Sequence, residues 1–335
     1  MASTTHILQD SFGRKHNYLR ISLIEKCNLR CTYCMPENGV LLSPKSHLMT
    51  GKEIIDIAGV FVKNGVTKIR LTGGEPLLRK DFSEIIKGLS KLDVQLSLTT
   101  NAILVDRFID DFEKYNIKDL NVSLDTLVSD KFKTITKRDQ FKKAYDNIQL
   151  LIDCRFNVKL NVVLIKDFNE DEIIDFIKLT KDSPINIRFI EFMPFDGNRW
   201  NKSKLVTQQE IEDIVYDYFG IEEVVTIPNE TNFTARNFRI NGYKGSYGVI
   251  SSVSNPFCDS CNRIRLTANG KLKNCLFSNG ETDLLSRFRQ GKPIEDLIQQ
   301  AIFKKKAVRA GMDTLEKLEN PFLHSKNRSM VTIGG

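Results

Sequence analysis

The sequence predicts an α/β fold in which short strands alternate with helices over the first two thirds of the chain. Runs rich in apolar and β-branched residues recur at 18–24, 68–74, 95–101, 120–126, 158–165 and 185–193. Helical patterns lie between most of these runs. One of them begins with a capping box, in which Thr50 and Glu53 precede the apolar segment 54–62. Strands that alternate with helices form a parallel sheet or a barrel.

Five of the predicted strands have one polar face, because side chains two residues apart share a face. This face carries Arg20 and Ser22, Arg70 and Thr72, Ser97, Thr99 and Asn101, Asn121, Ser123 and Asp125, and Lys159 and Asn161. Parallel sheets normally bury both faces, so a solvated face is the alternative. We predict instead an incomplete (β/α)6-type TIM-like barrel that encloses a large polar ligand. Without such a ligand, Arg20, Arg70 and Lys159 would repel one another inside the barrel.

The pattern changes after Phe195. A second capping box, Thr207 with Glu210, begins a helix, and short strands separated by glycine turns follow at 222–252. Helical segments are predicted at 281–312. We therefore predict two domains, a partial barrel at 1–195 and a smaller α+β domain at 196–335.

Length and composition indicate a folded protein with a substantial core. The chain has 335 residues, of which 41% are hydrophobic and 27% charged. Residues 1–17 lack the apolar run of a secretory signal, and no run is long enough to span a bilayer. We predict a cytoplasmic protein with no membrane partner. The net charge of +7 permits a phosphorylated ligand, and we predict no nucleic-acid partner.

The seven cysteines are distributed as two close triplets and a single residue, Cys154, which we assign to the core. This distribution favours reduced thiolates that bind metal over a disulfide framework. The first triplet, Cys27, Cys31 and Cys34, lies in the segment CNLRCTYC and follows the first predicted strand. The segment GGEP at 73–76 follows the second. In βα barrels the loops at this end of the strands carry out the chemistry.

The spacing Cys27-x3-Cys31-x2-Cys34, with Tyr33 before the last cysteine and with the later GGEP segment, resembles the signature of radical S-adenosylmethionine proteins. A structural zinc site or an ordinary iron–sulfur cluster takes four ligands. The resemblance implies that these three cysteines hold a 4Fe-4S cluster whose fourth iron binds S-adenosyl-L-methionine. The chemistry then belongs to the cofactor, which the protein positions.

The second triplet, Cys258-x2-Cys261-x13-Cys275, is also one ligand short. Together with the segment CNRIRL and the terminal Gly334 and Gly335, it makes the chain similar to the GTP 3',8-cyclase family, also called molybdenum cofactor biosynthesis protein A. The resemblance implies a second 4Fe-4S cluster, whose open iron binds the guanine of GTP. It also implies that the Gly-Gly tail inserts into the active-site cavity.

The resemblance assigns roles to individual residues. The catalytic set is Cys27, Cys31, Cys34, Arg263 and Arg265. Contacts to S-adenosylmethionine fall to Tyr33, Gly74, Ser123 and Met193. Contacts to GTP fall to Arg20, Lys68, Arg70, Thr99, Lys159, Arg188, Arg263, Ile264 and Arg265.

The reaction that the resemblance implies is a lyase-type cyclisation of GTP to (8S)-3',8-cyclo-7,8-dihydroguanosine 5'-triphosphate, the first step of molybdenum cofactor biosynthesis. Its implied partners are an electron donor such as flavodoxin or ferredoxin and, downstream, cyclic pyranopterin monophosphate synthase. A homodimer is left open. Two alternatives remain at this point: another two-cluster radical S-adenosylmethionine enzyme that modifies a peptide, and a zinc-dependent nucleic-acid-binding protein.

Overall fold

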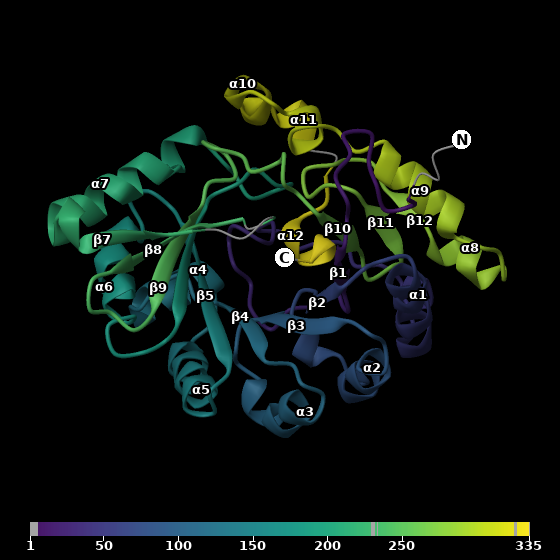
Figure 1. Cartoon of the computed structure of the whole chain (residues 1–335), viewed down its shortest axis with the longest axis horizontal. Helices are drawn as coiled ribbons and strands as arrows, with labels where there is room; N and C mark the ends of the chain where they lie inside the picture. The colour runs from purple at the N-terminus through teal and green to yellow at the C-terminus, as the bar shows by residue number, and fades with distance from the viewer. Residues whose placement is uncertain (1–5, 229–231, 233, 325–326, 335) are drawn as a thin grey trace.

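A computed structural model of the chain describes residues 6–228, 232, 234–324 and 327–334. Its strands form one twelve-stranded sheet with the order β12-β11-β10-β1-β2-β3-β4-β5-β6-β9-β8-β7. In Figure 1 the central strands curve around the middle of the molecule, and helices such as α1, α2, α3 and α5 lie outside them. Among the described residues no strand pairing joins β12 to β7, so the sheet stays open.

Six parallel strands occupy the centre of the sheet and confirm the six that we predicted from the sequence. They are β1 (Tyr18–Ser22), β2 (Lys68–Thr72), β3 (Gln95–Thr100), β4 (Asp119–Ser123), β5 (Asn157–Leu164) and β6 (Asn186–Glu191). Each pairs in parallel with the next along the chain. The register places Arg20 beside Arg70 and Asn121 beside Lys159. The polar side chains of neighbouring strands therefore meet on one face.

Helices on the outer side of this sheet bury its apolar face. They are α1 (Gly51–Lys63), α2 (Phe82–Leu89), α3 (Ile109–Lys114), α4 (Ser129–Thr136), α5 (Phe141–Asp153) and α6 (Ile173–Lys178). Helix α1 has the predicted capping box, in which Thr50 and Glu53 bond each other's backbone. Its buried residues Ile54, Ile57, Ala58 and Phe61 follow the helical period and form one face. Cys154 ends α5 and packs against the core, as predicted.

The C-terminal part contains the second predicted capping box, at the start of α7 (Gln208–Phe219), and the strands predicted at 222–252. Its strands are β7 (Val224–Ile227), β8 (Arg236–Ile240), β9 (Ser246–Ile250), β10 (Arg263–Leu266), β11 (Lys271–Lys273) and β12 (Thr282–Asp283). Its other helices are α8 (Leu285–Arg289), α9 (Glu295–Phe303), α10 (Leu315–Glu319), α11 (Pro321–His324) and α12 (Met330–Ile333).

The C-terminal strands join the same sheet instead of forming one of their own. Strand β9 pairs in parallel with β6, and β10 pairs in parallel with β1. A physical reason is that β1 and β6 would otherwise leave unpaired backbone N–H and C=O groups at two free edges. The sequence prediction of a smaller α+β unit did not anticipate this pairing. The division of the chain at residue 195 stays a prediction.

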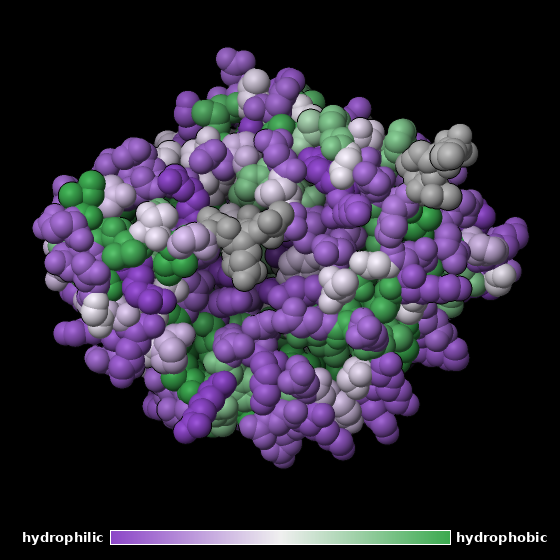
Figure 2. Space-filling model, in the orientation of Figure 1, coloured by the Kyte–Doolittle hydropathy of each residue, from purple (hydrophilic) through white to green (hydrophobic). Residues whose placement is uncertain are grey.

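Short 3-10 turns complete the described structure: η1 (Lys45–His47), η2 (Pro76–Leu78), η3 (Val105–Arg107), η4 (Glu170–Glu172), η5 (Lys202–Lys204), η6 (Ile221–Glu223) and η7 (Arg309–Gly311). Figure 2 shows hydrophilic residues over most of the visible face, with hydrophobic ones in small groups. Within the described ranges, none of the helices combines the length and the hydropathy that crossing a bilayer would require.

Candidate active site

The two cysteine triplets line a single cavity of about 300 Å³. All seven cysteines are free thiols, and the six of the triplets, Cys27, Cys31, Cys34, Cys258, Cys261 and Cys275, contribute to its wall. The first triplet follows the C-terminal end of β1. The second lies at the other end of this strand, because Tyr18 pairs with Arg263 and Cys261 comes two residues before Arg263. From Tyr18 to Ser22 a strand rises about 13 Å, so the cavity extends along the inside of the barrel from one triplet to the other.

The loop with the first triplet is held against two neighbouring segments. The backbone N–H groups of Arg30 and Thr32 donate to the carbonyls of Thr136 and Ile135, at 2.9 and 3.0 Å. On its other side the loop touches the GGEP segment so closely that a Cβ on Gly74 would lie 2.3 Å from the carbonyl oxygen of Lys26. Only glycine fits at this position.

The buried side chain of Glu75, in the GGEP segment, links neighbouring loops through hydrogen bonds. Its carboxylate accepts hydrogen bonds from Leu77 N (3.1 Å), Thr100 Oγ1 (2.9 Å) and Asn101 N (2.8 Å). Asn101 in turn donates to Asn28 Oδ1 at 2.7 Å, next to Cys27. Burial raises the pKa of Glu75 to about 7. This residue therefore positions the ends of β2 and β3 beside the cysteine loop.

The environment of the first triplet disfavours free thiolates. Burial raises the pKa of Cys27 to about 11, with the charge of Glu75 acting in the same direction. Burial and then the carboxylate of Asp125 raise the pKa of Cys31 as well. Asp125 is itself buried, which raises its pKa to about 6, and it accepts a hydrogen bond from Val163 N at 2.9 Å. Without a metal these thiols stay protonated, and a bound cationic group would supply the missing positive charge.

In the second triplet Cys261 has cationic surroundings, whereas burial raises the pKa of Cys258. The buried ammonium group of Lys305 donates to Cys261 Sγ at 3.4 Å and to the carbonyl of Arg263 at 2.9 Å. Burial favours the neutral thiol of Cys261, but the charges of Arg263 and Lys305 outweigh it and lower the pKa of Cys261 to about 6. Sequence reasoning missed Lys305, because nothing in the run Lys304–Lys306 distinguishes the buried lysine from its exposed neighbours.

A group of cations on the inner strand face lies between the triplets. We call Arg20, Arg70, Lys159 and Arg188 the cation face. Burial and, after it, the charges of neighbouring cations lower the pKa of Arg20 to about 9, of Lys159 to about 8 and of Arg188 to about 10. Among the described residues, Arg20 Nε, Arg70 Nε and Nη1, Arg263 Nη2 and Arg265 Nε are buried without a hydrogen-bond partner. Buried donors normally have partners, so this wall fits a polyanion such as a triphosphate.

Tyr18 is a further member of this wall that the sequence analysis overlooked. Its ring lies 5.7 Å from the guanidinium carbons of Arg20 and Arg70 and 5.8 Å from Lys68 Nζ. Burial opposes ionisation of the phenol, but the charges of Arg70 and Arg20 outweigh it and lower the pKa of Tyr18 to about 7. The strand period could have found this residue, since Tyr18 is two positions before Arg20 and shares its face.

The structure brings most of the predicted ligand contacts to the cavity. Its lining includes Tyr33, Gly74, Ser123 and Met193, assigned to S-adenosylmethionine, and Arg20, Thr99, Arg188, Arg263 and Arg265, assigned to GTP. Arg70 lies beside Arg20 in the sheet, and the charges of Arg188 and Arg70 act on Lys159. The lining of the cavity itself includes neither Arg70 nor Lys159. Lys68 pairs with Asp119 at 3.6 Å. The side chain of Ile264 points into the hydrophobic core, away from the cavity.

The C-terminal tail lies inside the barrel. Helix α12, which appears within the ring of strands in Figure 1, has buried Val331 and Ile333, and Met330 lines the cavity. Gly334 has a φ of 87°, and a Cβ there would lie 2.4 Å from Thr72 Oγ1. This is the region where the resemblance implies that the tail inserts. Gly335 lies outside the described residues.

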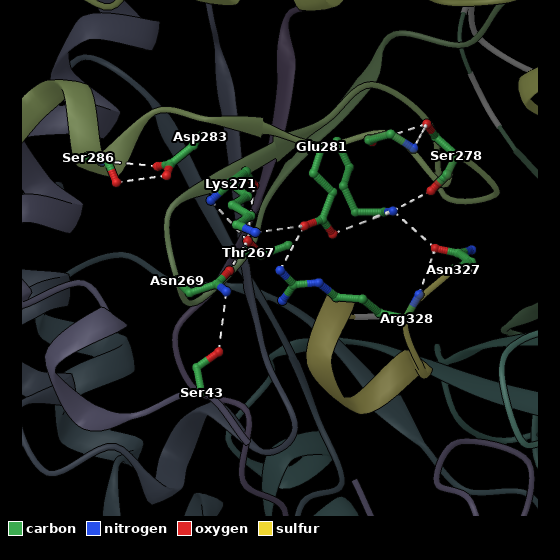
Figure 3. Close-up of polar contacts among 12 residues, drawn as sticks. Ser43, Thr267, Asn269, Lys271, Ser278, Glu281, Asp283, Ser286, Asn327 and Arg328 are labelled. Carbon is green, nitrogen blue, oxygen red and sulfur yellow. Dashed lines mark hydrogen bonds and ion pairs between the residues drawn. The ribbon is translucent and has the colours of Figure 1, made fainter. Parts of the chain in front are cut away.

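A polar cluster holds the segment that leads into this tail (Figure 3). In Figure 3, Arg328 donates to Glu281 Oε2, at a distance of 2.7 Å. Arg328 also lies 3.6 Å from Glu25 Oε1. The fully buried Lys273 donates to Asn327 Oδ1 at 3.0 Å and lies 3.8 Å from Glu281 Oε1. Asn327 also donates to the carbonyl of Leu276 at 2.9 Å. We call Glu25, Lys273, Glu281, Asn327 and Arg328 the tail anchor.

The cysteine geometry suits clusters better than single ions. In the part of the chain that the structure describes, no three His, Cys, Asp or Glu side chains converge as they would on one metal ion. Thiolates of an iron–sulfur cluster bind separate irons, so they need no common centre. The six free thiols along the cavity and the buried guanidinium nitrogens without a partner among the described residues therefore fit two clusters and an anionic nucleotide.

Two family models match the chain. The model described as Radical SAM superfamily matches residues 21–180, and the model described as Molybdenum Cofactor Synthesis C matches residues 185–310.

Curated relatives cover nearly the whole chain. The chain is 46% identical to "GTP 3',8-cyclase, mitochondrial" of Arabidopsis thaliana, over 98% of this chain and 84% of that protein. It is 42% identical to "GTP 3',8-cyclase" of Listeria welshimeri, over 89% and 91%. Human "Molybdenum cofactor biosynthesis protein 1" is 45% identical over 97% of this chain, which spans only 51% of that protein's length.

Solved structures share the fold at low identity. SuiB of Streptococcus suis aligns with a TM-score of 0.61 at 15% identity, over 88% of this chain and 70% of that one. The protein titled "Native anSMEcpe with bound AdoMet" aligns with a TM-score of 0.56 at 14% identity, over 92% and 88%. These likenesses confirm the α/β fold with a mostly parallel sheet that the sequence predicted.

Proposed function

Because the chain belongs to the GTP 3',8-cyclase family of radical S-adenosylmethionine proteins, we propose that it converts GTP to (8S)-3',8-cyclo-7,8-dihydroguanosine 5'-triphosphate. This reaction would be the first step of molybdenum cofactor biosynthesis. The two alternatives, a peptide-modifying enzyme and a zinc-dependent nucleic-acid-binding protein, receive no support from the family relationship.

One observation carries the proposal: a single cavity is lined by both cysteine triplets, with unpartnered cations between them. A peptide substrate would not require this concentration of positive charge. A nucleoside triphosphate would, because its phosphates satisfy several buried donors at once. The arrangement also gives the nucleotide two distinct ends, one toward each triplet.

The residues present suit two 4Fe-4S clusters, held by Cys27, Cys31 and Cys34 and by Cys258, Cys261 and Cys275. When bound, the first cluster together with S-adenosylmethionine would supply the radical that starts the reaction. Tyr33, Gly74, Ser123 and Met193, which line the cavity, would hold S-adenosylmethionine. The barrel wall would keep this site from solvent.

The cation face would bind the triphosphate of GTP. Arg20 and Arg70 are adjacent in the sheet, and Lys159 and Arg188 come from the two strands beyond β4. Thr99, Lys68 and the backbone around Ile264 would add contacts. Arg263 and Arg265, from β10 next to the second triplet, would orient the guanine end. The ribose then lies between the triplets, within reach of chemistry that begins at the first.

The tail would close the cavity. Gly334 already lies against Ser22 and Thr72, and we propose that this glycine segment takes part in the site. The tail anchor would act as a positioning device for this segment. Deleting both glycines should therefore reduce cyclisation more than cleavage of S-adenosylmethionine.

An anaerobic assay with GTP, S-adenosylmethionine and dithionite tests the proposal. We expect equal amounts of 5'-deoxyadenosine and cyclised nucleotide, and iron with acid-labile sulfide for two clusters. ATP in place of GTP is the matched control and should yield no cyclised product. Bound zinc, or cleavage of S-adenosylmethionine that GTP never couples to a nucleotide product, would contradict it.

Three further assignments belong to the proposal. A small electron-transfer protein such as flavodoxin or ferredoxin would reduce the first cluster, and cyclic pyranopterin monophosphate synthase would consume the product. A cytoplasmic location completes it. The name of the plant relative contains the word mitochondrial, so the compartment can differ within the family.

A further inference from the structure

A basic groove runs along the outer side of the loop that carries the first cysteine triplet. Its basic lining residues are Arg30, Lys137, Arg138, Lys166, Arg199 and Lys204. Among the described residues that line it, Glu37 is the single acidic one. All of these cations are exposed. We propose that this basic groove docks a small acidic electron-transfer protein, which delivers the electron that the first cluster needs. The proposal rests on the proposed function, because it requires the cluster.

The groove lies directly over the proposed cluster site. Thr32 and Met35, which line it, are the sequence neighbours of Cys31 and Cys34. Tyr33 lines both the groove and the inner cavity. The loop of the first triplet therefore lies between a docked partner and the inner cavity. The rate of electron transfer falls steeply with distance, so this is the favourable side for a protein donor, since the inner side holds the substrates.

The charges of the groove are available to a partner. Lys166 pairs with Glu210 at 2.6 Å, and Arg199 pairs with Glu37 at 2.5 Å. In contrast, Arg30, Lys137, Arg138 and Lys204 form no ion pair with any described residue. Several cations without carboxylate partners create a positive field that attracts an acidic protein and raises its association rate.

The centre of the groove is apolar, with a basic rim. Half-buried Met35, Pro36, Ile165 and Phe168 line it together with buried Ile135. An apolar centre with a charged rim is typical of protein interfaces, and transient electron-transfer contacts are small. A nucleic acid would use the same cations without needing the apolar centre, so we favour a protein occupant and test the alternative.

Backbone hydrogen bonds connect the rim of the groove to the cysteine loop. Lys137 and Arg138 follow α4 directly, and the carbonyls of Ile135 and Thr136 at the end of this helix accept hydrogen bonds from Thr32 and Arg30. Lys204 lies on η5, and its carbonyl accepts a hydrogen bond from Lys166 N at 3.0 Å. A partner bound to the rim would thus hold a fixed position relative to the cluster.

The step itself transfers a single electron. The cofactor of the partner loses one electron, the cluster held by Cys27, Cys31 and Cys34 gains it, and no bond forms or breaks in the transfer. The later use of this electron to cleave S-adenosylmethionine belongs to the proposed function.

The test uses the anaerobic holoprotein and a bacterial flavodoxin as the probe. Lys137→Glu/Arg138→Glu reverses two charges of the rim, and Lys204→Glu reverses a third on a separate element. The matched control, Lys87→Glu/Lys91→Glu, makes the same change on exposed residues at α2. Two quantities are measured: the dissociation constant of oxidised flavodoxin at low and high salt, without turnover, and the rate of cluster bleaching by fully reduced flavodoxin relative to that by dithionite.

We expect the double rim variant to weaken flavodoxin binding about tenfold or more at low salt and to lower the flavodoxin-to-dithionite rate ratio by a similar factor. Lys204→Glu should act in the same direction, and the control should stay within about twofold of wild type. Equal losses in rim and control variants, no reduction of the wild type by flavodoxin, or tight binding of a short RNA at the rim instead would overturn the proposal. Failure of the dithionite reaction to cyclise GTP in the wild type would instead contradict the proposed function.

Discussion

The two cysteine triplets have the same number of thiols but differ in the charged groups that act on them. Burial raises the pKa values of Cys27, Cys31 and Cys34, and the charges of Glu75 at Cys27 and of Asp125 at Cys31 and Cys34 act in the same direction. At Cys261 the charges of Arg263 and Lys305 outweigh burial and lower the pKa to about 6, whereas burial raises the pKa of Cys258. Two sites with three cysteine ligands each thus differ in the charged residues that surround the ligands.

This difference suggests a division of work between the triplets. An electron added to a cluster is repelled by nearby negative charge and stabilised by nearby positive charge. We therefore expect the first cluster to have the lower reduction potential, which suits the reductive cleavage of S-adenosylmethionine. The second site, with its cations, suits the binding of an electron-rich, anionic nucleotide.

The largest effect should come from removing a ligand of the first triplet. Cys34→Ser should abolish cleavage of S-adenosylmethionine, because the cluster loses a thiolate that fixes its assembly and potential. Cys154→Ser, which changes a core residue at the end of α5, is the control and should leave activity and iron content nearly unchanged. Loss of a cluster's iron from the Cys154 variant would show that our ligand sets are incorrect.

The cation face should affect the binding of GTP much more than the binding of S-adenosylmethionine. Arg70→Ala or Lys159→Ala removes a charge-assisted phosphate contact and should weaken GTP binding by about ten- to a hundredfold, or about 1.5–3 kcal/mol. Binding of S-adenosylmethionine should change much less. Equilibrium binding of both ligands measures this difference, and equal losses would indicate collapse of the barrel.

The tail anchor should control coupling between the two sites. Arg328→Ala breaks the contacts to Glu281 and Glu25, and we expect it to lower the ratio of cyclised GTP to 5'-deoxyadenosine about fivefold, because the tail loses its position. Lys317→Ala, which breaks an exposed pair with Asp313, serves as the control. A ratio unchanged from wild type in the Arg328 variant would separate the anchor from catalysis.

A smaller effect concerns the pH dependence of GTP affinity. The pKa of Tyr18 is lowered to about 7, so above this pH its phenolate competes with the triphosphate for Arg20 and Arg70. Lys159, with a pKa of about 8, loses its charge over the next unit, which acts in the same direction. GTP affinity should therefore fall as pH rises from about 7 to 9. Tyr18→Phe should flatten the lower part of this range, and an unchanged profile would exclude Tyr18.

Local patterns in the sequence were sufficient to predict much of the fold and site. The strand period placed Arg20, Thr99 and Ser123 on the inner face, and the capping boxes located the starts of α1 and α7. These features depend on neighbours within a few residues. These features also depend on the chemistry of the side chains, which is read directly from the sequence.

Long-range features escaped sequence reasoning for a physical reason. The pairing of β9 and β10 with opposite edges of the barrel joins residues far apart in the chain. The tail anchor unites Glu25 with Arg328. The burial of Lys305, in a run of three lysines, depends on packing against Cys261 and Arg263. No local pattern encodes such contacts.

The reduction potentials of the two proposed clusters test the central contrast most directly. An anaerobic redox titration followed by EPR, with S-adenosylmethionine added to identify the signal of the first cluster, measures both potentials in one sample. We predict the lower potential for the first cluster. Lys305→Met should lower the potential of the second by about 60 mV, a tenfold change for one electron, and leave the first unchanged. Equal or reversed potentials, or a shift of both clusters together, would contradict the account.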